Sequence, residues 1–174
     1  MPTSDLLRFY LHESVDTRGR RLREIRSFSL DQLEHTHDYI QWLFPLPERS
    51  SANLHAPLLS DSDMQAFAAD DDLRGELIES LRVMLRFFGL GLDEKSQAPY
   101  IGRSDDFRER QHVWLTPYNH NFLRITRILR SLSLLGCYAY AAALLRCLEA
   151  IHTEYRDVIG PRTMQFWRNA LPQA

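Results

Sequence analysis

The spacing of apolar residues is the feature of this sequence that most constrains its fold. Almost every periodic segment repeats its apolar residues at intervals of three and four, and no stretch sustains the period-two alternation of a half-buried strand. The chain has 174 residues, 44% of them hydrophobic, which is enough for one core and too little for two. We therefore expect an all-α fold, in which residues 1–174 form a single compact multi-helix domain with a buried central helix.

Caps and breakers divide the chain into helices. Ser29 followed by Gln32 has the pattern of a capping box and predicts a helix over residues 30–43. Pro45 and Pro47 stop this helix, because proline lacks the backbone N–H that a helix interior needs. The other expected helices cover about residues 5–12, 18–26, 62–68, 73–88, 120–135, 138–158 and 161–171, with a short helical piece after Ser104.

The expected helix over residues 30–43 is apolar on more than one side, which is typical of a helix buried in the middle of a domain. Its Tyr39 and Trp42 either pack under the proline-rich segment that follows or line a pocket. His37 lies on the apolar stripe and is expected to be a buried core histidine. A metal pair of His35 and His37 is not expected, because residues two apart on a helix point to different sides. We expect no metal site and no cofactor.

The helix expected over residues 120–135 has two distinct faces, one of them an ordinary apolar core stripe. Polar residues spaced four, three and four apart lie on the opposite side, within about 60° of one another: His120, Arg124, Arg127 and Ser131. A guanidinium presents paired donors that match two oxygens at once, so this row could hold a carboxylate or a phosphate. Alternatively, the two arginines pair with carboxylates of a neighbouring helix.

The charge distribution argues against nucleic acid as a partner. The formal net charge is −2 and the isoelectric point is near 6.4, so the chain has no overall field that would attract a polyanion. Residues 18–26 contain five arginines in nine positions and could contact a phosphate backbone. Glu24 interrupts this run, and a solvated helix face is the favoured interpretation.

Cysteine spacing and hydropathy bear on the compartment. Cys137 and Cys147 lie ten residues apart on one expected helix. Their backbones would be about 15 Å apart, beyond the reach of a disulfide, so we expect free thiols. The N-terminus lacks a secretory signal pattern, and a reducing cytoplasm is the expected location. The longest uncharged run, between Arg130 and Arg146, is shorter than the roughly 20 residues of a membrane span.

Catalysis has little support in the sequence. It contains no nucleophile-elbow pattern, no glycine-rich phosphate loop and no zinc-binding helix motif, and its seven histidines are scattered. Asp38 or Glu48 could form an acid/base set with His120 only if the fold brought them together. We expect a binding protein rather than an enzyme.

Several motifs along the chain resemble the opioid growth factor receptor conserved region. They are HDYIQWLFPL at residues 37–46, HNFLRITRILRSL at 120–132, LRFY at 7–10, FFGL at 87–90 and MQFWRN near the end. The matching positions are His37, Asp38, Tyr39, Gln41, Trp42, Asn53, Ala56, Pro57, Leu58, His120, Asn121, Arg124, Thr126 and Arg127. The resemblance covers nearly the whole chain and implies a receptor-like domain.

The resemblance also carries expectations about function. The family is associated with an enkephalin-type opioid peptide and a nucleus-associated receptor that restrains growth, and in its animal members a long polar, repeat-bearing tail follows the conserved region. This chain ends where that region ends, so it looks like a stand-alone domain of bacterial type.

Together, the residue patterns and the resemblance predict a ligand groove between the central helix and the Arg124/Arg127 face. Asp38 would orient a guanidinium or hold a ligand amine, and the two arginines would hold an anionic end such as a peptide carboxylate. The full candidate set is Asp38, Tyr39, Gln41, Trp42, Asn53, His120, Asn121, Arg124 and Arg127. We expect a non-catalytic module that binds a ligand or short peptide. The alternatives are an enzyme or sensor for a small phosphate or carboxylate ligand, and a structural helical protein that binds a protein partner.

Overall fold

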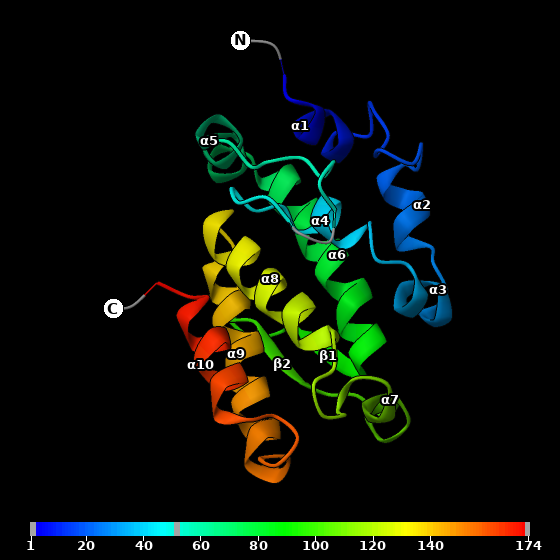
Figure 1. The fold of residues 1–174 in the computed structure, drawn as a ribbon. Coiled ribbons are helices and arrows are strands. Elements are labelled where there is room, and N and C mark those ends of the chain that lie inside the picture. The colour runs from blue at the N-terminus through cyan, green and yellow to red at the C-terminus, as the bar shows by residue number, and fades with distance from the viewer. Residues whose placement is uncertain (1–2, 51–52, 173–174) are drawn as a thin grey trace. The chain divides into compact units, whose positions relative to one another are not determined.

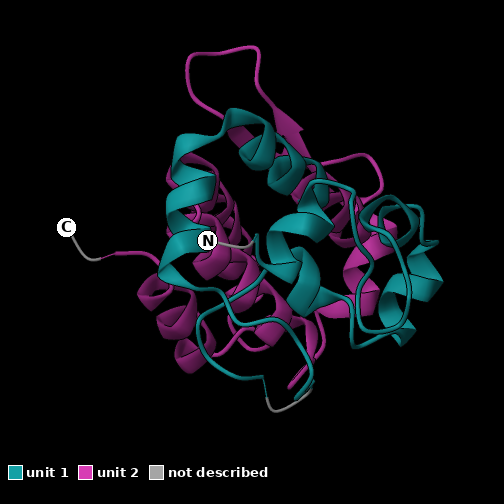
Figure 2. Ribbon diagram, turned by 90° about the horizontal axis from the view of Figure 1, so that it is seen from above, with its two compact units in different colours: residues 1–80 teal, residues 81–174 magenta. Residues whose placement is uncertain are grey.

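The computed structural model describes residues 3–50 and 53–172 of the chain. These residues divide into two compact units, Met1–Ser80 and Leu81–Ala174, which Figure 2 draws in different colours. The boundary falls within helix α6 (Asp71–Phe88). The expected single domain stays a prediction, and the expected multi-helix character is confirmed (Figure 1).

Unit 1 is built from short capped helices. They are α1 (Asp5–Tyr10), α2 (Leu22–Arg26), α3 (Leu30–His35), α4 (Ile40–Leu43), α5 (Asp61–Ala69) and the first part of α6. The capping box of Ser29 and Gln32 is confirmed at α3. Helix α5 begins one residue earlier than the expected 62–68 and is capped by Ser60, which forms its own capping box with Asp63. Hydroxyl caps satisfy N–H groups that the first turn leaves unbonded.

Aromatic side chains form the centre of the unit 1 core. The rings of Phe9 and Trp42 lie 5.0 Å apart between centroids, and those of Tyr10 and Phe67 lie 4.9 Å apart in an edge-to-face pair. The Tyr10 hydroxyl donates a 2.5 Å hydrogen bond to the Leu43 carbonyl, which ties α1 to the end of α4. Such pairs bury large apolar surfaces while their polar tips stay bonded.

The expected central helix is wrong as a continuous element. It is broken into α3 and α4, because residue Thr36 is extended, with φ −97° and ψ 128°. The break is closed by the Tyr39 hydroxyl, which donates to the Leu33 carbonyl at 2.9 Å. All four residues of α4 are buried, so the expected burial is confirmed for α4 alone. His37 falls in the break and is exposed, so the expected core histidine is also wrong.

Unit 2 contains a small sheet that the expectation of an all-α fold missed. Strands β1 (Leu90–Asp93) and β2 (Tyr100–Arg103) are antiparallel, with Leu90 opposite Arg103 and Asp93 opposite Tyr100. Each strand has only four residues and contains a glycine, so its side chains show too short an alternation to be recognised. The fold is mainly helical with one hairpin.

Helices α8, α9 and α10 lie side by side in unit 2 (Figure 1). The helices of this unit that follow α6 are α7 (Phe107–Trp114), α8 (Asn121–Leu134), α9 (Tyr138–Glu154) and α10 (Pro161–Asn169). Two buried indole groups tie the unit together. Trp114 Nε1 donates to the Phe88 carbonyl at 3.0 Å, and Trp167 Nε1 donates to the Phe122 carbonyl at 3.1 Å.

Gly89 permits the turn that ends α6. Its φ is +73°, a conformation that side chains disfavour, and a Cβ there would lie 2.7 Å from the Phe107 Cα atom and 2.9 Å from the Arg110 Cβ atom. Two backbones therefore approach each other closely at this glycine. Gly19 has a similar φ of +78°, but a Cβ there would meet nothing within 4 Å.

We predict that Gly89→Ala lowers the free energy of unfolding by more than about 3 kcal/mol, because strain and a backbone clash add together. Gly19→Ala is the matched control. It carries the strain without the clash and should cost only about 1 kcal/mol. Urea denaturation followed by circular dichroism measures both. Equal losses in the two variants would show that the close approach at Gly89 is not rigid.

Candidate functional site

Asp38, a candidate ligand contact, lies in an ionic cluster of unit 1. Its carboxylate accepts hydrogen bonds from Arg18 Nε at 2.9 Å and from an Arg20 guanidinium nitrogen at 2.8 Å. Arg20 also pairs with Asp16 at 2.6 Å, and the Asp16 side chain is fully buried. The carboxylate of Asp16 in turn accepts the backbone N–H groups of Arg18 and Arg20. We call these four residues the Asp16/Asp38 cluster.

The cluster shifts the ionisation of its members. Partial burial alone would raise the pKa of Asp38, but the hydrogen bonds from Arg20 and Arg18 outweigh it and hold the pKa below its ordinary value. Burial likewise would lower the pKa of Arg20, yet its bonds to Asp16 and Asp38 raise it. The charged forms of both groups are therefore favoured in the folded protein. Two arginines of the basic run are used inside unit 1, which favours an internal role over a phosphate-binding one.

The remaining unit 1 candidates make short-range structural contacts. Asn53 donates from Nδ2 to the Asp38 carbonyl at 3.1 Å, and its Oδ1 accepts the His55 N–H. Tyr39 is fully buried, and Gln41 and Trp42 are 3% and 4% exposed. Gln41 Oε1 and Trp42 Nε1 are buried without a hydrogen-bond partner among the described residues. The structure thus brings Asp38 and Asn53 together, and ligand contact by this set stays a prediction.

The unit 2 candidates differ strongly in exposure. His120 is exposed, Arg127 is half-buried, and Arg124 and Asn121 are 5% and 0% exposed. Arg124 donates to Asn121 Oδ1 at 3.1 Å, so these two candidates are in direct contact. Ser131, further along the predicted row, is fully buried. The row therefore runs from an exposed end at His120 into the interior, and the predicted groove beside it stays a prediction.

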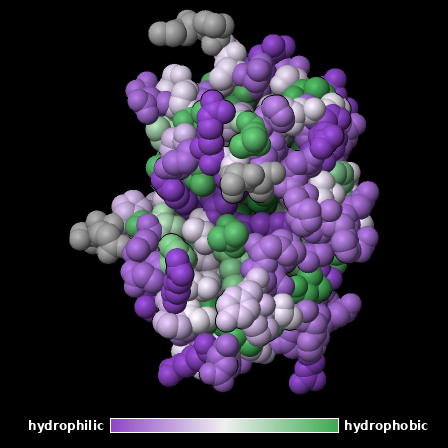
Figure 3. All heavy atoms as spheres, viewed as in Figure 1, coloured by the Kyte–Doolittle hydropathy of each residue, from purple (hydrophilic) through white to green (hydrophobic). Residues whose placement is uncertain are grey.

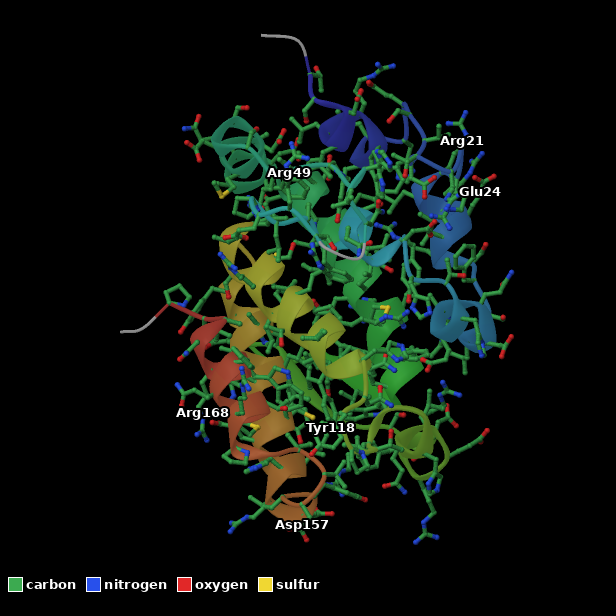
Figure 4. All side chains as sticks on the ribbon, viewed as in Figure 1. Arg21, Glu24, Arg49, Tyr118, Asp157 and Arg168 are labelled. Carbon is green, nitrogen blue, oxygen red and sulfur yellow. The ribbon has the colours of Figure 1, made fainter. Side chains whose placement is uncertain are left out.

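A pocket of about 580 Å³ lies at the exposed end of this row. It is lined by residues between 117 and 126, at the start of α8, and between 157 and 166, at the start of α10. Apolar side chains include Leu123 and Phe166, and polar ones include His120, Asp157 and Arg162. Figure 4 labels Tyr118, which precedes α8, and Asp157, which precedes α10. We call this the α8/α10 pocket.

Asn119 shapes the α8 side of this pocket. Its Nδ2 donates to the Val113 carbonyl at 3.0 Å and to Thr116 Oγ1 at 2.8 Å, while its Oδ1 accepts the Asn121 N–H at 2.9 Å. These bonds fix the turn before α8 and hold Tyr118 at φ +58°. A left-handed conformation is unfavourable for an aromatic residue, so the turn stores some strain.

The α10 side of the pocket is fixed by the start of the helix and by its packing on α8. Gly160 precedes Pro161, which takes the first helical position, where its missing N–H is harmless. Phe122 and Trp167 meet edge to face, 5.7 Å apart between centroids, and they anchor α10 on α8. Arg162 lies over the Phe166 ring at 5.6 Å. The pocket therefore has a packed floor and a charged rim.

Large apolar side chains are exposed around the pocket. Tyr118, Leu123 and Phe166 are 101%, 72% and 49% exposed. The face drawn in Figure 3 is mostly hydrophilic, with hydrophobic residues in small separate areas. Of the lining residues, only His120 belongs to the candidate set predicted from the sequence. The α10 side comes from residues about 40 positions further along, and no local pattern joins the two segments.

A second cavity of unit 2, about 440 Å³, lies between β2 and α9. It is lined in part by Arg103, Arg146, Cys147 and Glu154, and Arg103 pairs with Glu154 at 2.8 Å. Burial raises the pKa of the Cys147 thiol to about 11, with Arg103 opposing the shift. A thiol is a nucleophile only when ionised, so Cys147 does not suit covalent catalysis near neutral pH. Cys137 and Cys147 are both buried and free, which confirms the expectation of free thiols.

Within residues 3–50 and 53–172, no group of three or more His, Cys, Asp or Glu side chains is placed to hold a metal ion. None of the helices in the same ranges is both long enough and apolar enough to cross a membrane.

The described residues make up a mainly helical protein with ligand-sized cavities. Comparison with known proteins narrows this class to one family. The family model described as the opioid growth factor receptor (OGFr) conserved region matches residues 4–173. The chain therefore belongs to the family of the opioid growth factor receptor conserved region, as its motifs implied.

Its relatives are longer proteins. The opioid growth factor receptor of Mus musculus is 41% identical over 116 residues, which are 67% of this chain and 18% of that protein. The Homo sapiens receptor is 38% identical over 132 residues, 76% of this chain and 19% of that protein. Opioid growth factor receptor-like protein 1 of Xenopus tropicalis is 38% identical over 135 residues, 75% of this chain and 25% of that protein.

The chain thus spans about a fifth to a quarter of the length of these curated relatives. All three are vertebrate proteins, so they do not support the expected bacterial source. No solved structure matches the chain.

Asp38 should contribute more to stability at neutral pH than in acid. Because the pKa of Asp38 is lowered on folding, its contribution is complete above the unfolded value of about 4 and is lost as pH falls through the folded value. Asp38→Asn should lower the free energy of unfolding by about 1 to 3 kcal/mol at neutral pH. The variant should also show a shallower loss of stability in acid.

Asp31→Asn is the control, because the Asp31 side chain is 85% exposed. Denaturation midpoints measured from neutral pH down to about pH 3 compare the variants. Parallel curves for wild type and Asp38→Asn would contradict the role given to the cluster.

Both thiols should react slowly in the native protein. The native protein should react with an aromatic disulfide reagent roughly 100-fold more slowly than the protein in concentrated guanidinium chloride, because both cysteines are buried and Cys147 ionises only near pH 11. Thiolate release followed by absorbance measures both rates, and the denatured sample is the control. A rapid native phase that Cys147→Ser removes would show an accessible thiol.

Proposed function

We propose that this chain is a non-catalytic, receptor-like module whose α8/α10 pocket binds a short peptide. The observation that carries the proposal is the combination of an apolar floor, a charged rim and exposed aromatic side chains in one 580 Å³ pocket. Small-ligand sites are typically concave and mostly apolar, with a few polar groups that fix orientation. The size of this pocket suits a side chain and the adjoining backbone of a peptide.

The lining residues define what such a peptide would present. Leu123 and Phe166 offer contact to an aromatic or branched side chain. Asp157 can pair with an N-terminal amine, and Arg162 can pair with a carboxylate. A short peptide with free termini and an aromatic residue carries all three groups, whereas a free phosphate has no apolar part and a neutral sugar has neither an amine nor a carboxylate.

The family supports the same ligand class. Its members Opioid growth factor receptor of mouse and human are named as receptors for a growth factor of opioid type. An enkephalin-type peptide has the amine, aromatic and carboxylate groups that the pocket complements. Because the chain covers only part of those receptors, the proposal concerns peptide binding by this domain and leaves their other activities aside.

The candidates Arg124 and Arg127, predicted from the sequence, define a competing location for the peptide site. If Arg124 and Arg127 hold the peptide carboxylate, binding would depend on the α8 face rather than on the pocket rim. A reducing, cytoplasmic location is part of the same proposal, supported by the two free cysteines.

We predict that Phe166→Ala weakens binding of an enkephalin-type peptide at least about fivefold, or about 1 kcal/mol, because the aromatic contact is lost. Tyr138→Ala is the matched control. Tyr138 is 50% exposed, as Phe166 is 49% exposed, but it does not line the pocket. Isothermal titration calorimetry measures the Kd of each variant, and both side chains are exposed enough for the fold to survive.

Modified peptides and further variants separate the contacts of the peptide amine from those of its carboxylate. Acetylation of the peptide amine should weaken binding to the wild-type protein but have little effect on binding to Asp157→Asn. Amidation of the peptide carboxylate should weaken binding to the wild-type protein but have little effect on binding to Arg162→Ala. Loss of binding in Arg127→Ala with none in Phe166→Ala would move the site to the α8 face. An absence of heat and of any thermal stabilisation with the peptide would overturn the proposed function.

A further inference from the structure

A polar cavity of about 410 Å³ lies within unit 1, separate in chain position from the α8/α10 pocket. Its walls come from α1, from the loop of residues 11–21 and from Trp42 of α4. Almost all of its lining residues are charged or hydroxyl-bearing, in contrast to the apolar floor of the α8/α10 pocket. A cavity of this kind is suited to a small polar molecule rather than to an apolar side chain.

Trp42 is the exception among the three tryptophans of the chain. The indole N–H groups of Trp114 and Trp167 each donate to a backbone carbonyl. The Trp42 side chain is equally buried, at 4% exposure, but its Nε1 has no acceptor among the described residues. A buried indole N–H ordinarily has a partner, so Trp42 is a lining residue of the cavity whose covered N–H lacks an acceptor among the described residues.

Charges of both signs surround the cavity. Arg8 is exposed, and its guanidinium makes no ion pair with any residue that the structure describes. Arg21, labelled beside Glu24 in Figure 4, donates from one nitrogen to the His12 carbonyl. Asp5 and Glu13 are exposed carboxylates of the same lining. The lining therefore holds two arginines and two carboxylates that can face a ligand.

The loop that forms one wall is held in place before any ligand binds. The N–H groups of Glu13 and Ser14 both donate to the Arg8 carbonyl. The Asp16 side chain, which is also part of the lining, is already occupied by Arg20 and by two backbone N–H groups. Asp16 therefore neither repels nor binds a ligand, and a preformed loop reduces the ordering cost of binding.

We propose that this cavity binds a small zwitterion of the α-amino acid class. The ligand carboxylate accepts hydrogen bonds from Trp42 Nε1 and from Arg8, and the ligand ammonium lies against Asp5 or Glu13. A simple anion would meet the two carboxylates and a simple cation would meet the two arginines, whereas a zwitterion is complementary to both. Nε1 is covered in the structure, so exposed rim side chains rearrange as the ligand enters, as is common on binding.

The indole N–H resonances provide a direct test. In a two-dimensional ¹H–¹⁵N spectrum the chain gives three indole signals, and Trp42→Phe identifies the signal of Trp42. Titration with glycine, L-alanine or L-leucine should shift this signal in a saturable way, because Nε1 gains an acceptor. The signals of Trp114 and Trp167, which already have acceptors, are internal controls and should stay in place.

Analogues and variants define the chemistry. N-acetyl-L-alanine lacks the ammonium and L-alaninamide lacks the carboxylate, so each should bind at least about tenfold more weakly than L-alanine. Arg8→Ala should weaken L-alanine at least about fivefold, whereas Arg23→Ala, an exposed arginine of α2 outside the cavity, should not.

Failure of the Trp42 signal to move with any of the three amino acids would overturn the proposal. Equal binding of the two analogues, or no effect of Arg8→Ala, would do so as well. Because Arg8 is exposed, this variant remains informative even if Trp42→Phe fails to fold. The outcome is independent of the α8/α10 pocket, whose peptide binding is measured with different variants.

Discussion

The organisation of unit 1 depends on the pairing of buried carboxylates with arginines. An ionised carboxylate such as that of Asp16 is tolerated in the interior only if charges and hydrogen bonds replace the water that it has lost. Arg20 supplies the charge, and the backbone of the same loop supplies the hydrogen bonds. This demand orders the loop after α1, and through Asp38 it reaches the segment between α3 and α4. A chain segment without periodicity is thereby held by ion pairs and hydrogen bonds.

Unit 2 has exposed ion pairs such as that of Arg103 with Glu154, and its core is tied by neutral contacts. Its tryptophans place large rings in the core and use their single polar atom to bind the end of a neighbouring element, the Phe88 carbonyl in one case and the Phe122 carbonyl in the other. Such contacts lock distant segments in register without requiring a charge to be buried. The α8/α10 pocket depends on this arrangement, because the contact between Trp167 and Phe122 sets where α10 begins relative to α8.

The sequence predicted features whose causes are local. Helix ends were recognised where a cap or a breaker acts within a few residues, as at Ser29, Gly89 and Pro161. The family was also recognised, because its motifs lie in contiguous stretches. The break at residue 36 was missed because no proline or glycine marks it, and the nearby pairing of Asp38 with Arg20 joins residues 18 positions apart. The hairpin was missed because four-residue strands carry too little alternation, and most of the pocket was missed because its two sides are separated in the chain.

Tyr118 also bears on how the protein has been selected. Its side chain is fully exposed at φ +58°, so it costs conformational free energy and returns little packing. A chain selected for folding alone would replace it with glycine or asparagine, which accept this backbone readily. An aromatic ring in so unfavourable a place reflects a compromise between stability and another requirement. The evolutionary record of this position in related proteins should therefore follow the partner rather than the fold.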